Sequence, residues 1–154
     1  MTKQCIVIGA GGHAVVVADA LQEMGLEVVA FLEKDTANKK DSQLVGLPVL
    51  ISESALANFE PSQVHLVNGI GDIQNRKQVQ LGLVQKGWTF TGLIHPTAVI
   101  SKFSEVATDA QIHANAVVQA NTKIGNGVII NSNVVIEHDC NVGEWTHIAP
   151  SAAI

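Results

Sequence analysis

The second part of the chain repeats an aliphatic residue at every sixth position, from residue 94 to residue 154. A small or β-branched residue follows four positions after each of the first ten, and polar, turn-forming residues lie between. A period of six fits neither an α-helix nor a plain strand. It is typical of a β-helix, in which each hexapeptide forms one side of a triangular coil around the periodic residues. These residues are Ile94, Ile100, Val106, Ile112, Val118, Ile124, Ile130, Ile136, Val142, Ile148 and Ile154.

The first part of the chain has a different pattern, with continuous apolar runs that end at glycines. The run at 4–8 predicts a buried parallel strand. Residues 15–24 follow as a helix with Gly25 as its C-terminal cap, and 26–32 as a second strand. A strand, a glycine turn, a helix and a parallel strand in this order indicate the start of an α/β domain.

The pattern of apolar and polar residues predicts more α/β elements before the repeat. The segment at 46–51 is expected at the edge of the sheet, because Pro48 lacks the N–H that a central strand needs. Ser52 or Ser54 is suited to cap a short helix, and Asp72 a longer one. The further elements are a short helix ending at Phe59, a strand at 64–70, a helix at 73–86 and a strand at 88–93. We therefore expect two domains, an α/β domain at 1–92 and a β-helix at 93–154.

Composition narrows the class of protein. The chain is 47% apolar and 15% charged, so it can bury a sizeable core and is not disordered. Nine basic residues without a clustered stripe, and a net charge of −5, argue against a nucleic-acid partner. No segment approaches the length of a membrane span or the pattern of a signal peptide. Cys5 and Cys140, at positions expected to be buried, favour reduced thiols in a cytoplasmic protein.

The glycine turn after the first predicted strand is a candidate phosphate site. Glycine lets a ligand approach the backbone closely, and the helix N-terminus offers free N–H groups to an anion. Gly9, Gly11 and Ala14 loosely match the dinucleotide fingerprint, and Glu33 and Asp35 lie near the place of a ribose-binding acid. The alternative is a tight turn that binds no ligand.

Ionisable residues gather at 136–148, in a chain that is otherwise poor in charge. His138 lies between two inward positions and is expected at an exposed corner, where a histidine can act as a general base. Asp139 beside it is suited to orient the imidazole and stabilise its charged form. His147 is expected on a flat outer face. Three β-helices packed side by side would bury such faces. We therefore predict a homotrimer with its sites in the clefts between subunits.

Four segments together resemble a known family. They are Ile-Gly-Ala-Gly-Gly-His at 8–13, Gly-Ile-Gly-Asp at 69–72 with Asn-Arg after it, Leu-Ile-His-Pro at 93–96, and the repeat itself. The whole chain is similar to bacterial sugar acetyltransferases, which include sialic acid O-acetyltransferases and nucleotide-activated amino-sugar N-acetyltransferases. The resemblance implies a Rossmann-like N-terminal half followed by a left-handed parallel β-helix.

The resemblance also implies roles for single residues. His138 falls on the catalytic base of the family, Asp139 on the acid that orients it, and His147 on a histidine near the thioester of acetyl-CoA. The expected nucleotide-sugar contacts are Gly11, Gly12, His13, Gly71, Asp72 and Arg76, with Glu33 and Asp35 where other members often carry paired acids. No metal is implied. The chain ends in mid-coil, so we expect it to be a fragment or to hold acetyl-CoA in an incomplete site.

These observations predict a cytoplasmic, acetyl-CoA-dependent acetyltransferase that acts on a nucleotide-activated amino sugar, such as a UDP-sugar, or on sialic acid. Cell-surface polysaccharide synthesis is the expected setting. One alternative is a non-catalytic nucleotide-sugar-binding fragment or scaffold. Another is a β-helix zinc carbonic anhydrase, for which His113, His138 and His147 are the available ligands. An NAD-dependent oxidoreductase would rest on the glycine turn alone.

Overall fold

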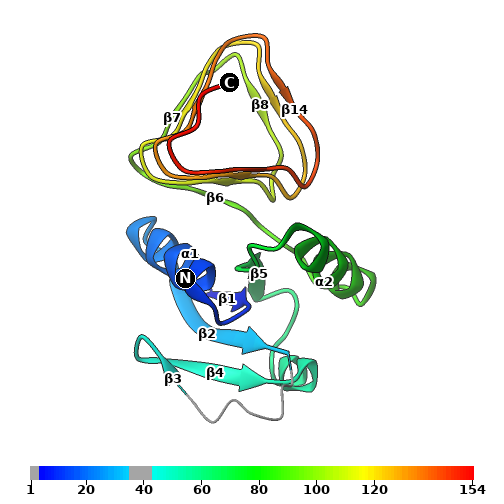
Figure 1. The fold of residues 1–154 in the computed structure, drawn as a ribbon. Coiled ribbons are helices and arrows are strands. Elements are labelled where there is room, and N and C mark those ends of the chain that lie inside the picture. The colour runs from blue at the N-terminus through cyan, green and yellow to red at the C-terminus, as the bar shows by residue number, and fades with distance from the viewer. Residues whose placement is uncertain (1–3, 35–42) are drawn as a thin grey trace. The chain divides into compact units, whose positions relative to one another are not determined.

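The computed structural model describes residues 4–34 and 43–154. The chain forms two compact units, Met1–Phe90 and Thr91–Ile154. Figure 1 shows a sheet with helices in the first unit and a triangular coil in the second.

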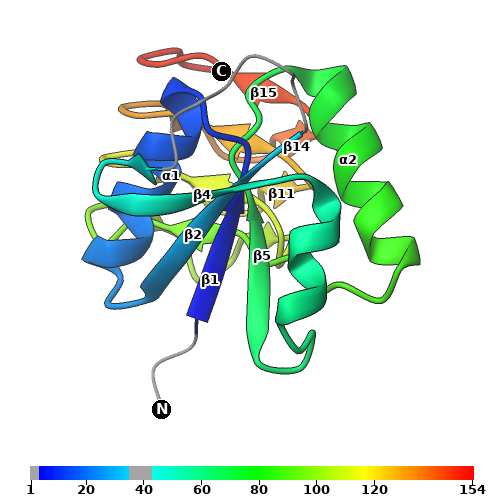
Figure 2. The ribbon, with the colours of Figure 1, turned by 90° about the horizontal axis from the view of Figure 1, so that it is seen from below.

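The first unit is built on a five-stranded sheet in the order β3-β4-β2-β1-β5 (Figure 2). All pairs are parallel except β3 with β4, which are antiparallel. The strands are β1 (Gln4–Ile8), β2 (Glu27–Glu33), β3 (Gln43–Leu44), β4 (Leu47–Ile51) and β5 (Val64–Asn68). The helices are α1 (Gly12–Glu23), the 3₁₀ helix η1 (Glu53–Asn58) and α2 (Ile73–Gln85). Ile6, Leu32 and Leu66 belong to the buried core, which their continuous apolar runs predicted.

Helix α1 begins three residues earlier than the apolar pattern predicted. Gly11 has an extended backbone, with φ −93° and ψ −173°, and is the N-cap residue. Gly12 and His13 therefore belong to the first helical turn and not to a loop. The predicted C-terminal end is confirmed to within a residue, since Met24 is the C-cap and Gly25 follows with a φ of 76°.

Two other expectations for the first unit need correction. The predicted strand at 88–93 is wrong, because only Phe90 forms an isolated bridge with β5. From Gly92 onward the backbone N–H groups bond to the β-helix instead, with Gly92 donating to Thr108 at 2.8 Å. Strand β4 is not the outermost strand, since β3 pairs with it, but Pro48 does lie on this outer, antiparallel side. The predicted caps are confirmed, with Ser52 capping η1 and Asp72 capping α2.

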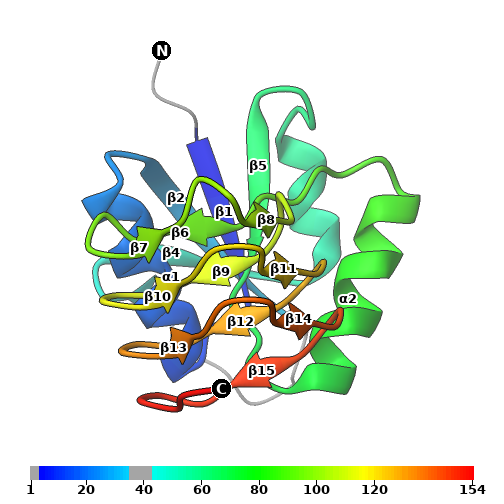
Figure 3. The same cartoon turned by 90° about the horizontal axis from the view of Figure 1, so that it is seen from above.

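The second unit is a parallel β-helix, as the period of six predicted. Its strands form three sheets, β13-β10-β7, β14-β11-β8 and β15-β12-β9-β6, one for each side of the triangle (Figure 3). Paired residues are eighteen apart throughout, so each coil contains three hexapeptides. The strands are β6 (Leu93–Ile94), β7 (Val99–Ile100), β8 (Glu105–Val106), β9 (Gln111–Ile112), β10 (Val117–Val118), β11 (Lys123–Ile124), β12 (Ile129–Ile130), β13 (Val135–Ile136), β14 (Asn141–Val142) and β15 (His147–Ile148).

The interior of the β-helix contains both sets of periodic residues. Ile112, Ile130 and Ile136 are fully buried there, and the small residues Ala116 and Val134 pack beside them. Cys140 occupies one of the small inward positions and is half-buried. The fold class predicted from the sequence, a Rossmann-like α/β unit followed by a left-handed β-helix, is confirmed.

The corners of the β-helix have a repeated backbone conformation. At every sixth residue from 115 to 151 the backbone φ lies between 58° and 64°, in the left-handed region. Asn, Asp and Gly tolerate this region best, and they fill five of the seven positions. The seven residues are Asn115, Asn121, Gly127, Asn133, Asp139, Trp145 and Ser151. None of the helices in the described ranges is long and apolar enough to span a membrane.

Candidate active site

His138 and Asp139 form a hydrogen-bonded pair at an exposed corner of the β-helix. The Nδ1 atom of His138 lies 2.5 Å from Oδ2 of Asp139, and their side chains are 73% and 61% exposed. Adjacent side chains on a strand diverge, but Asp139 has a left-handed φ of 63° and closes the turn. The corner therefore brings together two side chains that a regular strand would separate.

The contacts of this pair shift both pKa values. The hydrogen bond to Asp139, and then the negative charge of that carboxylate, raise the pKa of His138, with a smaller effect from Glu137. Hydrogen bonds from Asn121 first, and then from His138, lower the pKa of Asp139. An ionised carboxylate only accepts hydrogen bonds, so Nδ1 of His138 carries the proton and donates it. Nε2 then has the lone pair that a general base needs.

His147 is half-buried at the start of β15, and Asn131 contacts its ring. Nδ2 of Asn131 lies 3.1 Å from Nε2 of His147. Oδ1 of Asn131 accepts the backbone N–H of Ser132 at 2.8 Å, which fixes the orientation of the amide. An amide NH₂ only donates, so Nε2 of His147 accepts this hydrogen bond.

The two glycine turns of the first unit lie next to each other. Strand β1 lies between β2 and β5, so the crevice between β1 and β5 is the topological switch point, where open α/β sheets bind ligands. A Cβ atom on Gly69 would stand 2.7 Å from the Cβ of Ala14, so only glycine allows this approach. A Cβ on Gly71 would stand 3.9 Å from the Cβ of His13. The fold thus brings together the two segments that the sequence singled out.

A buried polar network holds the second glycine turn. The guanidinium of Arg76, 1% exposed, donates from Nη1 to the carbonyl of Gly71 at 2.8 Å. Burial lowers the pKa of Arg76, and the charge of Asp72 partly offsets this effect. Asn68 donates to the carbonyl of Arg76 and to Oε1 of Gln80, both at 3.1 Å. Arg76 thus braces the turn from inside, while Asp72 caps α2 through the N–H of Asn75 at 2.9 Å.

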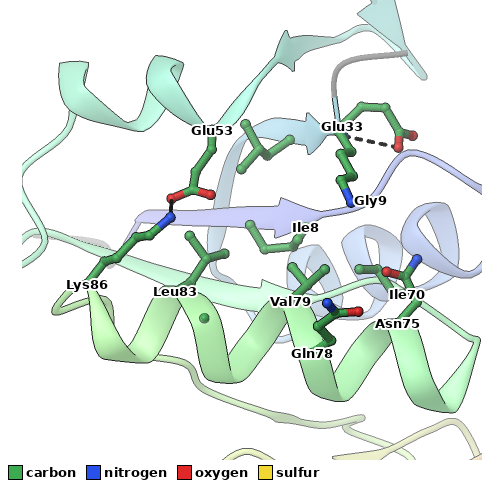
Figure 4. A pocket seen from close by; sticks show the side chains of 13 residues that line it. Ile8, Gly9, Glu33, Glu53, Ile70, Asn75, Gln78, Val79, Leu83 and Lys86 are labelled. Atoms are coloured by element: carbon green, nitrogen blue, oxygen red, sulfur yellow. Dashed lines mark hydrogen bonds and ion pairs between the residues drawn. The ribbon is translucent and has the colours of Figure 1, made fainter.

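A cavity of about 250 Å³ lies at the carboxyl ends of β1 and β2 (Figure 4). Glu33 lies on its rim, as expected from the sequence, whereas Gly11, Gly12, His13, Gly71, Asp72 and Arg76 do not line it. Asp35 lies outside the described residues. The cavity has an apolar floor and a charged rim, on which Lys86 contacts Glu53 at 2.5 Å. The lining residues are Ile8, Gly9, Leu32, Glu33, Lys34, Glu53, Ile70, Asn75, Gln78, Val79, Gly82, Leu83 and Lys86.

Sequence reasoning missed the wall that α2 contributes to this cavity. Its residues recur at helical spacing, with Asn75, Val79, Gly82 and Lys86 three or four positions apart. That spacing marks one face of the helix and was a usable signal. Within a single chain, no cluster of three or more metal-ligating side chains occurs in 4–34 or 43–154.

Two protein families match the chain. Residues 4–82 match the family described as the PglD N-terminal domain, and residues 121–154 match the bacterial transferase hexapeptide repeat. The first match covers the βαβ start and most of α2, and the second covers the coils that carry His138 and His147. A comparison with curated proteins found no match.

Solved structures of sugar acetyltransferases are similar over almost the whole chain. The acetyltransferase domain of PglB from Neisseria gonorrhoeae, in complex with acetyl coenzyme A, is 29% identical with a TM-score of 0.87. That match covers 99% of this chain and 73% of the other. PerB from Caulobacter crescentus, in complex with CoA and GDP-perosamine, is 30% identical with a TM-score of 0.87, over 97% and 70% of the two chains.

WeeI from Acinetobacter baumannii is more distant, at 16% identity and a TM-score of 0.58, over 97% of this chain and 92% of the other. It supports the fold alone.

The PerB match reaches 30% identity over most of both chains, and the PglD N-terminal match covers half of this chain. The chain therefore belongs to the family of sugar acetyltransferases that join a PglD N-terminal domain to transferase hexapeptide repeats.

Proposed function

We propose that this protein is an acetyl-CoA-dependent N-acetyltransferase that acts on a nucleotide-activated amino sugar. The observation that carries the proposal is the hydrogen-bonded pair of His138 and Asp139 on a hexapeptide β-helix. The ligands of the similar structures, acetyl coenzyme A in PglB and CoA with GDP-perosamine in PerB, support the two substrates. Perosamine is an amino sugar, and this favours an amine acceptor over the hydroxyl of sialic acid.

The pair accounts for proton removal during acetyl transfer. Asp139 holds the proton of His138 on Nδ1, so Nε2 accepts a proton from the sugar amine as the nitrogen attacks the thioester carbonyl. The new C–N bond forms as the C–S bond breaks. The imidazolium then returns its proton to the departing sulfur, giving CoA thiol and an acetamido sugar. The Asp139 carboxylate stabilises the imidazolium between these steps.

The first unit is suited to the nucleotide part of the acceptor. The first turn of α1 starts at Gly12 without a side-chain cap, and the N-terminus of a helix is suited to bind a phosphate. The cavity beside it has an apolar floor for a flat base and an acid, Glu33, for hydroxyl groups. Gly11, Gly12, His13 and Glu33 thus remain our candidates for substrate contacts. We assign Arg76 and Asp72 the role of bracing the second glycine turn.

One face of the β-helix supports a homotrimer. The outward positions of the β13-β10-β7 sheet are all aliphatic, and Val99 is 62% exposed. The corresponding positions of the β14-β11-β8 sheet are polar. The outward residues are Val99, Val117 and Val135 on the first face and Glu105, Lys123 and Asn141 on the second. We expect Val117→Arg to yield monomers in light scattering, whereas Asn141→Arg leaves the trimer intact. Monomeric wild-type protein would contradict the trimer.

The proposed chemistry is tested by replacing His138. The assay follows release of CoA thiol from acetyl-CoA with GDP- and UDP-linked amino sugars as acceptors. We expect His138→Ala to lose about a hundredfold or more in kcat with an unchanged unfolding midpoint, because a positioned base contributes on that order. Gln119→Ala, an exposed change on the neighbouring coil, is the control. Full activity of folded His138→Ala protein would overturn the mechanism.

A further inference from the structure

Three hydrogen bonds to the neighbouring coil hold in place the segment that carries His138. The backbone N–H of Asp139 donates to the carbonyl of Ala120 at 3.1 Å. The buried hydroxyl of Thr122 donates to the carbonyl of Glu137 at 3.0 Å. The side-chain amide of Asn121 donates from Nδ2 to Oδ1 of Asp139. Two contacts fix the backbone on either side of His138, and the third fixes the carboxylate.

We propose that Asn121 is a positioning residue for acetyl transfer, which orients Asp139 so that its second oxygen holds His138 in the basic tautomer. The inference rests on the proposed function of His138 as the base. It adds a third member, eighteen residues earlier in the chain, to the pair that the sequence identified.

The geometry shows what the third member contributes. Asp139 is 61% exposed, and an exposed carboxylate is free to rotate and to exchange its partners for water. The amide of Asn121 engages Oδ1, so Oδ2 faces Nδ1 of His138 at 2.5 Å. Asn121 and Asp139 occupy equivalent corners of successive coils, with φ values of 60° and 63°. Their side chains leave the backbone in the same direction, which aligns the donor with the acceptor.

The backbone requirement of the corner does not by itself explain Asn121. Asn133 occupies another corner, with a φ of 59°, and is also exposed. There the backbone N–H of Asn133, and not its side chain, donates a hydrogen bond to the carbonyl of Ala114. Asn133 is thus a matched control for asparagine at a left-handed corner. Glycine adopts this φ without strain, so Asn→Gly removes the amide and keeps the turn.

Two substitutions of Asn121 shift the titration of His138 in opposite directions. The charged groups that act on His138 are Asp139 and Glu137, and the neighbouring coil contributes the neutral Asn121. Asn121→Gly loosens the carboxylate, so the pKa of His138 falls toward its ordinary value. Asn121→Asp places a second carboxylate beside the first, so the pKa of His138 rises further. The added carboxylate of Asn121→Asp acts through its charge alone, so the fall in Asn121→Gly is the shift that tests the positioning role.

The experiment is an NMR titration of the imidazole of His138 in the full chain, together with the pH profile of kcat. We expect a lower midpoint for Asn121→Gly, a higher one for Asn121→Asp and no change for Asn133→Gly. We also expect kcat to fall roughly tenfold in Asn121→Gly with unchanged KM values, since a hydrogen bond to a charged group is lost. In an Asp139→Asn background, Asn121→Gly should shift the midpoint no further.

Unchanged titration of His138 in Asn121→Gly would overturn the inference, as would an equal shift of this variant with and without Asp139. The NMR titration is independent of turnover. If His138→Ala kept its activity while the Asn121 variants shifted the titration, the proposed function would fail and the positioning of His138 would stand. If His138→Ala were inactive and the titration did not shift, only the role of Asn121 would fail.

Discussion

The indole of Trp145 occupies the space directly over Gly127, eighteen residues earlier at the equivalent corner. A Cβ atom on Gly127 would stand 2.3 Å from Cε3 of Trp145, far inside van der Waals contact. Both residues have a left-handed φ, of 63° and 64°, and Trp145 is only 8% exposed. A bulky residue rarely adopts this backbone conformation, and here the glycine makes room for the ring. The corner that follows the His138 pair along the chain is therefore closed by a matched glycine and tryptophan.

We predict that Gly127→Ala destabilises the protein by about 1–3 kcal/mol, because the new methyl group must displace a buried ring. Urea unfolding monitored by tryptophan fluorescence and circular dichroism measures the change. Gly143→Ala is the control, since a Cβ there meets nothing within 4 Å, and it should change stability by less than about 0.5 kcal/mol. In a Trp145→Ala background, Gly127→Ala should cost much less. Equal costs in both backgrounds would contradict the contact.

The rate of acetyl transfer should rise with pH through a pKa above the ordinary histidine value of about 6.5. The base must be neutral, and the hydrogen bond and charge of Asp139 raise the pKa of His138, so the imidazole stays protonated to higher pH. Asp139→Asn removes the charge, so the midpoint of kcat/KM against pH should move to lower pH. A midpoint that does not move would show that another group titrates.

We predict that Arg76→Met destabilises the first unit by about 1–3 kcal/mol, because the carbonyl of Gly71 loses its buried donor. The KM for the sugar nucleotide should rise as the second glycine turn loosens, while the KM for acetyl-CoA stays the same. Thermal unfolding and initial-rate kinetics measure the two effects. The neighbouring Lys77 is exposed, so Lys77→Met serves as the control. An unchanged unfolding midpoint for Arg76→Met would contradict the bracing role.

Gly82 offers a way to fill the cavity without disturbing the core. It lines the cavity from α2, and a Cβ there meets nothing within 4 Å. Gly82→Ala should stabilise the protein by about 0.5–1 kcal/mol through helix propensity. Gly82→Leu should raise the KM for the sugar nucleotide roughly tenfold, the equivalent of about 1.4 kcal/mol of binding. Isothermal titration with the nucleotide alone checks this result, and unchanged binding to Gly82→Leu would place the nucleotide elsewhere.

Local pattern was sufficient for most elements of the fold. The period of six predicted every strand of the β-helix, because each inward position must be aliphatic to fill a narrow interior. Strand β1, the caps Ser52 and Asp72, and Gly25 after α1 also follow from short-range rules. The expected strand at 88–93 failed because its apolar residues gave no sign that the backbone of Gly92 bonds to the next coil.

The sequence by itself determined the repeat, its coil of three hexapeptides, the two glycine turns and the adjacent placing of His138 and Asp139 at a corner. These depend on residue type and spacing along the chain, which the sequence states directly. Only the tertiary structure decided which side chains meet across coils and helices. Because successive coils are offset by eighteen residues, their stacking brings Asn121 next to Asp139 and Trp145 next to Gly127. In the first unit, the packing of α2 on the sheet buries Arg76 and shapes the cavity. Contacts of this kind depend on side-chain direction and burial, which arise when the elements pack together.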